Sequence, residues 1–340
     1  MPDADALLEP VLALHHRIRE AVVGACEHQA SEQLAAVAAD GEGDTTYAVD
    51  RIAVDVLVAG LSGIAAREPL VLIAEGLESQ GRILPEGARA QDCRWRVIVD
   101  PVDGTRGLMY QKRSAWILTG VARNRGPDTR LRDVTLAVQT EIPLVKQHLC
   151  DQLWARRERG AEARRFNRIT GEHAPLVPRP SRADSIEHGF ATVVRFFPGV
   201  RDVLAALDDD IVRGVLGAPV LGKAACFEDQ YTSTGGQLYE LMTGHDRFIA
   251  DLRPLMAPVF AERGLPAGLC CHPYDICTAL IAAELGVELA DGAGAPLDAP
   301  LDLASDVAWV GYANAALRRR VEPVLHAALA RRGLMPAPNA

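Results

Sequence analysis

The stretch of sequence that most constrains the fold is RWRVIVDPVDGTRG, at residues 94–107. Its apolar residues predict a buried strand from Trp95 to Asp100, and α/β proteins place their sites at the ends of such strands. Pro101 fixes one backbone dihedral angle and stiffens the turn that follows. We therefore expect the strand end to hold the carboxylates of Asp100 and Asp103 in one small volume.

Two carboxylates this close repel each other, and each raises the pKa of the other unless a cation lies beside them. Mg²⁺ prefers oxygen ligands and binds through few carboxylates, waters and substrate phosphate. Gly104 allows the backbone to approach a ligand closely. Thr105 is expected to start a helix, whose first N–H groups can face an anion. The pattern predicts a metal and phosphate site, with a plain turn of Asp, Pro and Gly as the alternative.

Composition narrows the class of protein. The chain has 340 residues, which is enough for about two domains. Its net charge of −9 provides no general attraction to a nucleic acid polymer. We do not expect the acidic N-terminus to act as a signal peptide. No run approaches about 20 apolar residues, so we predict no membrane span.

Seven cysteines are scattered without a C-x-x-C pair, which favours reduced thiols in a cytoplasmic protein. The segment CCHPYDIC gathers three of them around His272, but the spacing matches no standard zinc site.

The hydrophobic pattern predicts an α/β protein of two sub-domains, at residues 1–180 and 181–340. His15 lies on the apolar face of the first predicted helix and is expected to be a buried, hydrogen-bonded core residue. The other elements are predicted from periodicity and turn residues. We expect helices at 5–30, from Asp50 onward, and at 198–217; strands at 70–74, 95–100, 114–122, 133–140, 153–161 and 190–197; exposed loops at 79–92 and 123–130; a linker at 171–184; and a helix, a short strand and a glycine-rich turn across 275–292.

Four segments together resemble the inositol monophosphatase family of Mg²⁺-dependent phosphatases, which includes inositol phosphatases, bisphosphate nucleotidases and some fructose bisphosphatases. DPVDGT at 100–105 is similar to the first signature of that family. The other similar segments are DTTYAVD at 44–50, AEGLE at 74–78, and PYDICTALIAAELGVELADGAGAPLD at 273–298. The D-x-D-G-T element of haloacid-dehalogenase-like phosphatases fits less well, because it has one residue between its aspartates instead of two.

The resemblance implies a layered αβαβα sandwich and a site for two to three Mg²⁺ ions. In such enzymes the ions would be held by Glu75, Asp100, the carbonyl of Val102, Asp103 and Asp275. The ions would activate water, which Thr105 would orient while Asp44 accepts a hydrogen bond from the Thr105 hydroxyl. The N–H groups of Gly104 and Thr105 would bind phosphate. Asp44 and Asp275 could instead simply cap helices.

The sequence differs from the family pattern at several positions, but none of these positions is an expected metal ligand. Gly76 stands where the family commonly has a second glutamate, Tyr47 replaces a threonine, and Tyr274 replaces a tryptophan. Gly76 puts the usual local hydrogen-bond network in doubt.

The sequence gives weaker evidence for the residues that bind substrate than for the metal ligands. Arg195 and Lys223 are candidates for a second phosphate and Glu240 for sugar hydroxyls, with surface solvation as the alternative for each. The segment 242–268 is longer than the family pattern and is read as an inserted helix or helical pair.

The prediction is a Mg²⁺-dependent phosphomonoesterase acting on a small phosphorylated polyol or sugar. The alternatives are a bisphosphate nucleotidase, a fructose-bisphosphatase-type enzyme, or a catalytically weak relative that binds metal or an anion. Lithium inhibition and a homodimer are implied by the resemblance alone.

Overall fold

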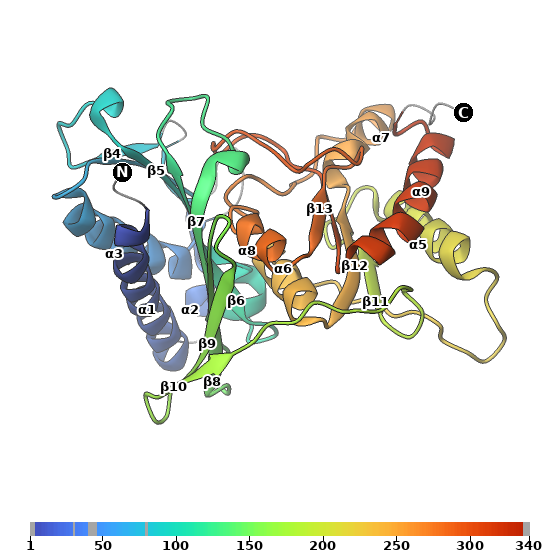
Figure 1. Ribbon diagram of the computed structural model, residues 1–340, viewed down its shortest axis with the longest axis horizontal. Helices are drawn as coiled ribbons and strands as arrows, with labels where there is room; N and C mark the ends of the chain where they lie inside the picture. The colour runs from blue at the N-terminus through green and yellow to red at the C-terminus, as the bar shows by residue number, and fades with distance from the viewer. Residues whose placement is uncertain (1–3, 30, 40–45, 79–80, 336–340) are drawn as a thin grey trace.

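The computed structural model describes residues 4–29, 31–39, 46–78 and 81–335. Its elements are stacked as helices, sheet, helices, sheet and helices (Figure 1). The predicted αβαβα sandwich is thereby confirmed. Within the described ranges, no helix combines the length and the apolar character that crossing a membrane requires.

The first sheet has eight strands in the order β10-β9-β8-β7-β6-β5-β3-β4. Only β3 and β5 pair in parallel, and every other pairing is antiparallel. The strands are β3 (Leu70–Ala74), β4 (Arg82–Leu84), β5 (Trp95–Asp103), β6 (Ala115–Arg123), β7 (Val134–Ile142), β8 (Leu149–Arg156), β9 (Ala161–Asn167) and β10 (His173–Leu176).

Helices α1 (Asp5–His28) and α3 (Ala48–Ala65) cover one face of this sheet. The protein has two hydrophobic cores, one on each face of this sheet. The side chains of β5 alternate between them, because successive side chains of a strand point to opposite faces. Val97 and Val99 pack with α1 and α3, whereas Ile98 packs toward the second sheet. The short elements on this side of the molecule are α2 (Ser31–Leu34), β1 (Val37–Ala39), β2 (Thr46–Tyr47), α4 (Thr105–Met109) and the 3-10 turns Ala90–Asp92 and Leu131–Asp133.

His15 is a core residue, as predicted. It is fully buried, and its ring nitrogens lie 2.9 Å from Thr140 Oγ1 and 2.8 Å from Thr119 Oγ1. Burial, with the nearby Arg19 charge, lowers the pKa of His15 to about 3, so the ring is neutral.

The second sheet has four strands in the order β11-β12-β14-β13. Helices α6 and α8 lie between the two sheets, and α5 and α9 cover the far face (Figure 1). The elements are β11 (Phe190–Val193), α5 (Arg201–Leu216), α6 (Thr234–Thr243), β12 (Asp246–Asp251), the 3-10 turn Arg253–Met256, α7 (Ala257–Glu262), α8 (Ala279–Glu284), β13 (Glu288–Ala290), β14 (Trp309–Tyr312) and α9 (Ala315–Arg331).

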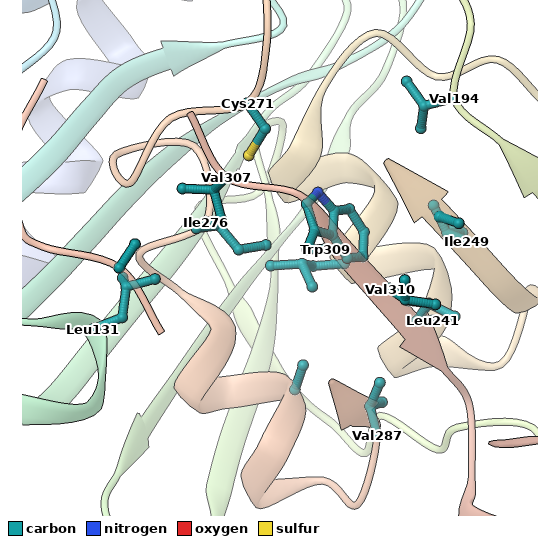
Figure 2. Close-up of a cluster of buried hydrophobic side chains, with 14 of the residues drawn as sticks. Leu131, Val194, Leu241, Ile249, Cys271, Ile276, Val287, Val307, Trp309 and Val310 are labelled. Carbon is teal, nitrogen blue, oxygen red and sulfur yellow. The ribbon is translucent and has the colours of Figure 1, made fainter. Parts of the chain in front are cut away.

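The core of this half surrounds Trp309, a fully buried residue of β14 (Figure 2). Leu241 from α6, Ile249 from β12 and Cys271 belong to the same cluster of buried side chains (Figure 2). Burial of this many apolar side chains provides the main driving force for folding.

The expectation of an inserted helix or helical pair at 242–268 is wrong for its central part. Residues 246–251 form β12, which pairs in parallel with β11 and antiparallel with β14. Beyond the end of α6 at Thr243, the helical residues of that stretch are Arg253–Met256 and Ala257–Glu262. β12 is an inner strand of the second sheet with buried apolar residues, so tertiary pairing decides the conformation.

Smaller differences concern where elements end. β5 runs through Pro101 to Asp103, the expected strand at 153–161 is the end of β8 plus the start of β9, and β4 and β10 lie inside predicted connections. The helix expected after Asp275 is the short α8. The division at residue 180 stays a prediction, although all strands of the first sheet precede it and those of the second follow it.

Candidate metal centre

Asp100 and Asp103 come from the end of β5, as the sequence suggested. The pairing of β5 with β6 shifts register between these two residues, which turns both carboxylates toward the same pocket. Asp100 Oδ1 accepts a hydrogen bond from the backbone N–H of Val102 at 2.9 Å. Gly104 follows with φ +95°, a conformation that L residues rarely adopt.

Asp103 is held by the start of α6, a helix from the other half of the chain. Its Oδ2 accepts hydrogen bonds from Ser233 Oγ at 2.8 Å and from the N–H of Gly235 at 2.5 Å. Ser233 is the N-cap of α6, so the carboxylate lies at the positive end of the helix dipole.

Asp275 completes a cluster of three carboxylates. One side-chain oxygen from each of Asp100, Asp103 and Asp275 lies within 4.8 Å of the others. The N–H of His272 donates to Asp275 Oδ2 at 2.6 Å, which fixes the side chain before the short turn that leads to α8. Residues far apart in sequence thus converge as predicted.

Glu75 lines the same pocket, one residue after the end of β3. β3 and β5 are neighbouring parallel strands, so their ends lie at the same edge of the sheet. Glu75 is close enough to contribute to the raised pKa of Asp100. It is not part of the tight cluster of three aspartates.

Thr105 begins α4 and contacts a carboxylate that the sequence interpretation passed over. Its Oγ1 lies 2.7 Å from Asp50 Oδ1 and 2.7 Å from the carbonyl oxygen of Val102. Asp44, the predicted acceptor, lies outside the described residues. The signal for Asp50 was present in the sequence, since it is the last residue of the DTTYAVD segment.

The charge balance of the cluster fits a cation. Burial, with the nearby Asp275 carboxylate, raises the pKa of Asp103 to about 8. Burial also raises the pKa of Asp100, with further contributions from Glu75, Asp103 and Asp275. Among the described residues, no Lys or Arg forms a salt bridge with Asp100 or Asp103. Hard carboxylate oxygens without a protein counter-charge are a suitable donor set for Mg²⁺.

The structure does not bring the three predicted substrate contacts into this pocket. Arg195 forms an ion pair with Glu228 and lies 3.8 Å from Asp208. Glu240 hydrogen-bonds to His245, and Lys223 is exposed in the connection between α5 and α6. Arg195 and Glu240 thus pair with neighbours that their sequence positions do not reveal.

Other residues line the pocket instead, and sequence reasoning missed them. The Arg106 guanidinium lies between the rings of Tyr47 and Phe197, at 5.8 and 5.4 Å from their centres. Further lining comes from Phe196, Arg253, Leu269, Cys270, His272 and Tyr274. The pocket therefore joins a carboxylate floor to an aromatic and cationic wall.

The order of layers and the position of the carboxylates at a sheet edge define the fold class. It is the fold of solved structures that include a fructose-1,6-bisphosphatase and the protein SuhB.

Three solved structures show the similarity. Fructose-1,6-bisphosphatase from Leishmania major aligns with a TM-score of 0.66 and 14% identity, over 96% of this chain and 95% of that one. The extragenic suppressor protein SuhB from Bartonella henselae aligns with a TM-score of 0.62 and 16% identity, over 94% of this chain and 98% of that one. A hypothetical protein from Pyrococcus horikoshii with similarities to inositol-1 monophosphatase aligns with a TM-score of 0.62 and 13% identity, over 95% of this chain and 98% of that one.

At these identities the similarity establishes the fold. No protein-family model matches the sequence, and no curated protein matches it significantly.

Proposed function

We propose that the protein is a Mg²⁺-dependent phosphomonoesterase that hydrolyses a small phosphorylated polyol or sugar. The observation that carries this proposal is the convergence of Asp100, Asp103 and Asp275, with carboxylate oxygens within 4.8 Å of one another. The fold shared with a fructose-1,6-bisphosphatase supports it. A homodimer in the cytoplasm accompanies the proposal as an expectation from the resemblance and the free thiols.

The residues of the site would have distinct roles in the reaction. Asp100, Asp103, Asp275, Glu75 and the carbonyl of Val102 would hold Mg²⁺. The bound cation would neutralise phosphate charge and lower the pKa of water.

The remaining groups of the strand end would act on water and phosphate. Thr105 would orient the attacking water, because its hydroxyl is fixed by Asp50 and the Val102 carbonyl. The N–H groups of Gly104 and Thr105 would donate to phosphate oxygens.

A second candidate substrate is a bisphosphorylated nucleotide. The wall of the pocket contains Arg106 between two aromatic rings, and Phe196 and Phe197 contact each other edge to face with ring centres 4.9 Å apart. Aromatic and guanidinium groups suit a planar base and a second phosphate.

A catalytically weak relative that binds metal or an anion is the alternative of another class. Three sequence features favour it: Gly76 in place of a family glutamate, Tyr47 in place of a threonine, and the segment 242–268. Gly76 has φ +78°, and a Cβ there would lie 3.3 Å from Val54 Cγ2, so the local backbone accounts for glycine at this position.

Phosphate release from a panel of monoesters, with and without Mg²⁺, tests the proposal. The panel contains inositol 1-phosphate, fructose 1,6-bisphosphate and adenosine 3′,5′-bisphosphate. Asp103→Asn is expected to reduce turnover by about 100-fold or more, since it removes a charged ligand of the cation. Asp128→Asn, at an exposed position outside the site, is the matched control.

Mg²⁺ should also raise the melting temperature of the wild type and raise it less for Asp103→Asn. Lithium is added in the same assay. Mg²⁺-independent turnover, or full turnover by Asp103→Asn, would contradict the metal site. Stabilisation by Mg²⁺ without turnover of any ester would favour the weak-binding alternative.

A further inference from the structure

A second cavity, of about 430 Å³, lies between α1 and the strands β8, β9 and β10. It shares no lining residue with the carboxylate pocket. Its walls are Glu9, Leu12, Ala13, His16 and Arg19 from α1, with Gln152, Arg164, Phe166, Gly171 and His173 from the sheet side. A volume of this size suits a small metabolite and exceeds what a single water needs.

Strand register places the polar groups of this cavity on one face of the sheet. Gln152 pairs with Arg164 across β8 and β9, and Phe166 pairs with His173 across β9 and β10. Residues paired across neighbouring strands point to the same face. Arg165 points to the opposite face, where it forms an ion pair with Asp151. The pleat of the sheet therefore directs the side chains of Gln152, Arg164, Phe166 and His173 toward the cavity.

Arg19 is the most unusual member of this set. Its side chain is only 2% exposed, and its guanidinium lies 4.2 Å from the centre of the Phe166 ring. Nε donates to Glu20 at 3.2 Å, and Nη2 lies 2.5 Å from His16 Nδ1. Its Nη1 has no hydrogen-bond partner among the described residues. This open donor is one that an acceptor inside the cavity could reach.

Arg164 provides a second open donor. Its Nε and Nη2 both donate to Gln152 Oε1, at 2.9 and 2.6 Å. Its Nη1 has no partner in the described part of the chain, and no carboxylate there forms a salt bridge with it. Two guanidinium groups thus border one cavity. Their acidic neighbours are Glu20, whose side chain is 50% exposed and pairs with Arg19, and Glu9 in the lining.

The arginine charges also reach the two imidazoles of the cavity. Burial, and then the Arg19 charge, lowers the pKa of His16. Burial, and then the Arg164 and Arg19 charges, lowers the pKa of His173. Glu9 is the one acidic residue in the lining. A positive cavity in a chain of net charge −9 is a local exception.

We propose that this cavity is a second binding site, separate from the metal centre, for a small organic oxyanion such as a phosphate or carboxylate compound. The open Nη1 donors of Arg19 and Arg164 bind the anionic group. Glu9 accepts a hydrogen bond from a hydroxyl or amino group on the same ligand. Phe166 is covered by Arg19, His16 and His173, so the site recognises charge rather than an aromatic ring.

Calorimetric titration of the metal-free protein with inorganic phosphate tests this site. Divalent cations are omitted so that phosphate cannot bind through a metal ion in the carboxylate pocket, and the Arg164 variant assigns saturable binding to the second cavity. Arg164→Gln is expected to weaken binding by about tenfold or more, since it removes a charged hydrogen-bond donor. The matched control is Arg179→Gln, whose exposed side chain lies outside the cavity.

NMR titration of the histidines gives an independent readout. In the wild type, phosphate should raise the pKa of His16 and His173, because its charge offsets the Arg19 and Arg164 charges that add to the effect of burial. This readout does not depend on Arg164→Gln keeping its fold. Equal binding by wild type and Arg164→Gln, absence of saturable binding, or loss of binding in Asp103→Asn would each overturn the proposal. The outcome is independent of phosphatase activity.

Discussion

At the scale of single residues, Asp50 connects the start of a helix to the candidate site. One carboxylate oxygen accepts from the N–H of Tyr47 at 2.7 Å, as in a capping box at the start of α3. The other oxygen lies 2.7 Å from Thr105 Oγ1. Because a hydroxyl has one proton, Thr105 donates either to Asp50 or to the Val102 carbonyl, and its lone pairs remain available to water.

This arrangement predicts that Asp50, rather than Asp44, supports the reaction. Asp50→Asn should lower kcat by about 100-fold with little change in KM, because a neutral amide is a weaker acceptor for the Thr105 hydroxyl. Asp44→Asn should leave kcat close to the wild-type value. Steady-state kinetics on the best ester of the panel measures both.

A melting curve of each variant separates this effect from the capping role of Asp50, which contributes about 1 kcal/mol to stability. A large loss of kcat in Asp44→Asn with none in Asp50→Asn would restore the sequence-based assignment.

At the scale of elements, the turn between β5 and α4 depends on the start of α6. Gly104 has φ +95°, and a Cβ there would lie 2.9 Å from Ser233 Cβ. Ser233 is the residue that caps α6 and donates to Asp103. The turn, the cap and the carboxylate therefore fit together only if residue 104 has no side chain.

Gly104→Ala should consequently destabilise the protein more than a glycine substitution that meets no neighbour. Gly126→Ala is the matched control, since Gly126 has φ +64° and no atom lies within 4 Å of an added Cβ. The free energy of unfolding of the control should fall by about 1 kcal/mol, from the left-handed backbone alone. Gly104→Ala should lose a further 1 to 3 kcal/mol or so, through the contact with Ser233. Chemical denaturation measures both, and equal losses would contradict the close packing.

The elements also show what sequence could predict. The end of β5 and its two aspartates were readable, because an apolar run, a proline and two acids within ten residues form a local pattern. β12 was not readable, because its conformation comes from pairing with β11 and β14, which are distant in sequence. The position of Arg195 was equally hidden, since its partners Asp208 and Glu228 meet it only in the folded chain.

At the scale of the whole molecule, the two halves meet at the layer of α6 and α8 (Figure 1). Gln139 from β7 illustrates the link. Its amide donates to the Gly235 carbonyl at 2.7 Å and accepts from Thr278 Oγ1 at 2.9 Å. Gly235 holds Asp103, and Thr278 follows Asp275 in the same segment. The geometry of the carboxylates thus depends on both sheets being folded.

Buried charge near that interface makes stability depend on pH. Burial, with Glu240 and Asp229 nearby, raises the pKa of Asp246 to about 7, against the opposing effect of His245 and Arg113. Asp246 is 6% exposed and has no side-chain hydrogen bond among the described residues. In the unfolded chain its pKa is about 4. Between these values the native state holds a proton that the unfolded state has released, so stability falls as the pH rises.

Asp246→Asn should remove this contribution, because an amide stays neutral at every pH. The free energy of unfolding of the variant relative to wild type should increase from pH 4.5 to pH 8, by an amount on the order of 3 kcal/mol. Urea denaturation of both proteins across this range measures the difference. Groups common to both proteins cancel, including Asp208, whose pKa is raised to about 6 by burial. Asp128→Asn, at an exposed position, should show no such trend. A constant difference between Asp246→Asn and wild type across the range would mean that Asp246 is ionised in the native protein, and that Arg113 and His245 outweigh its burial.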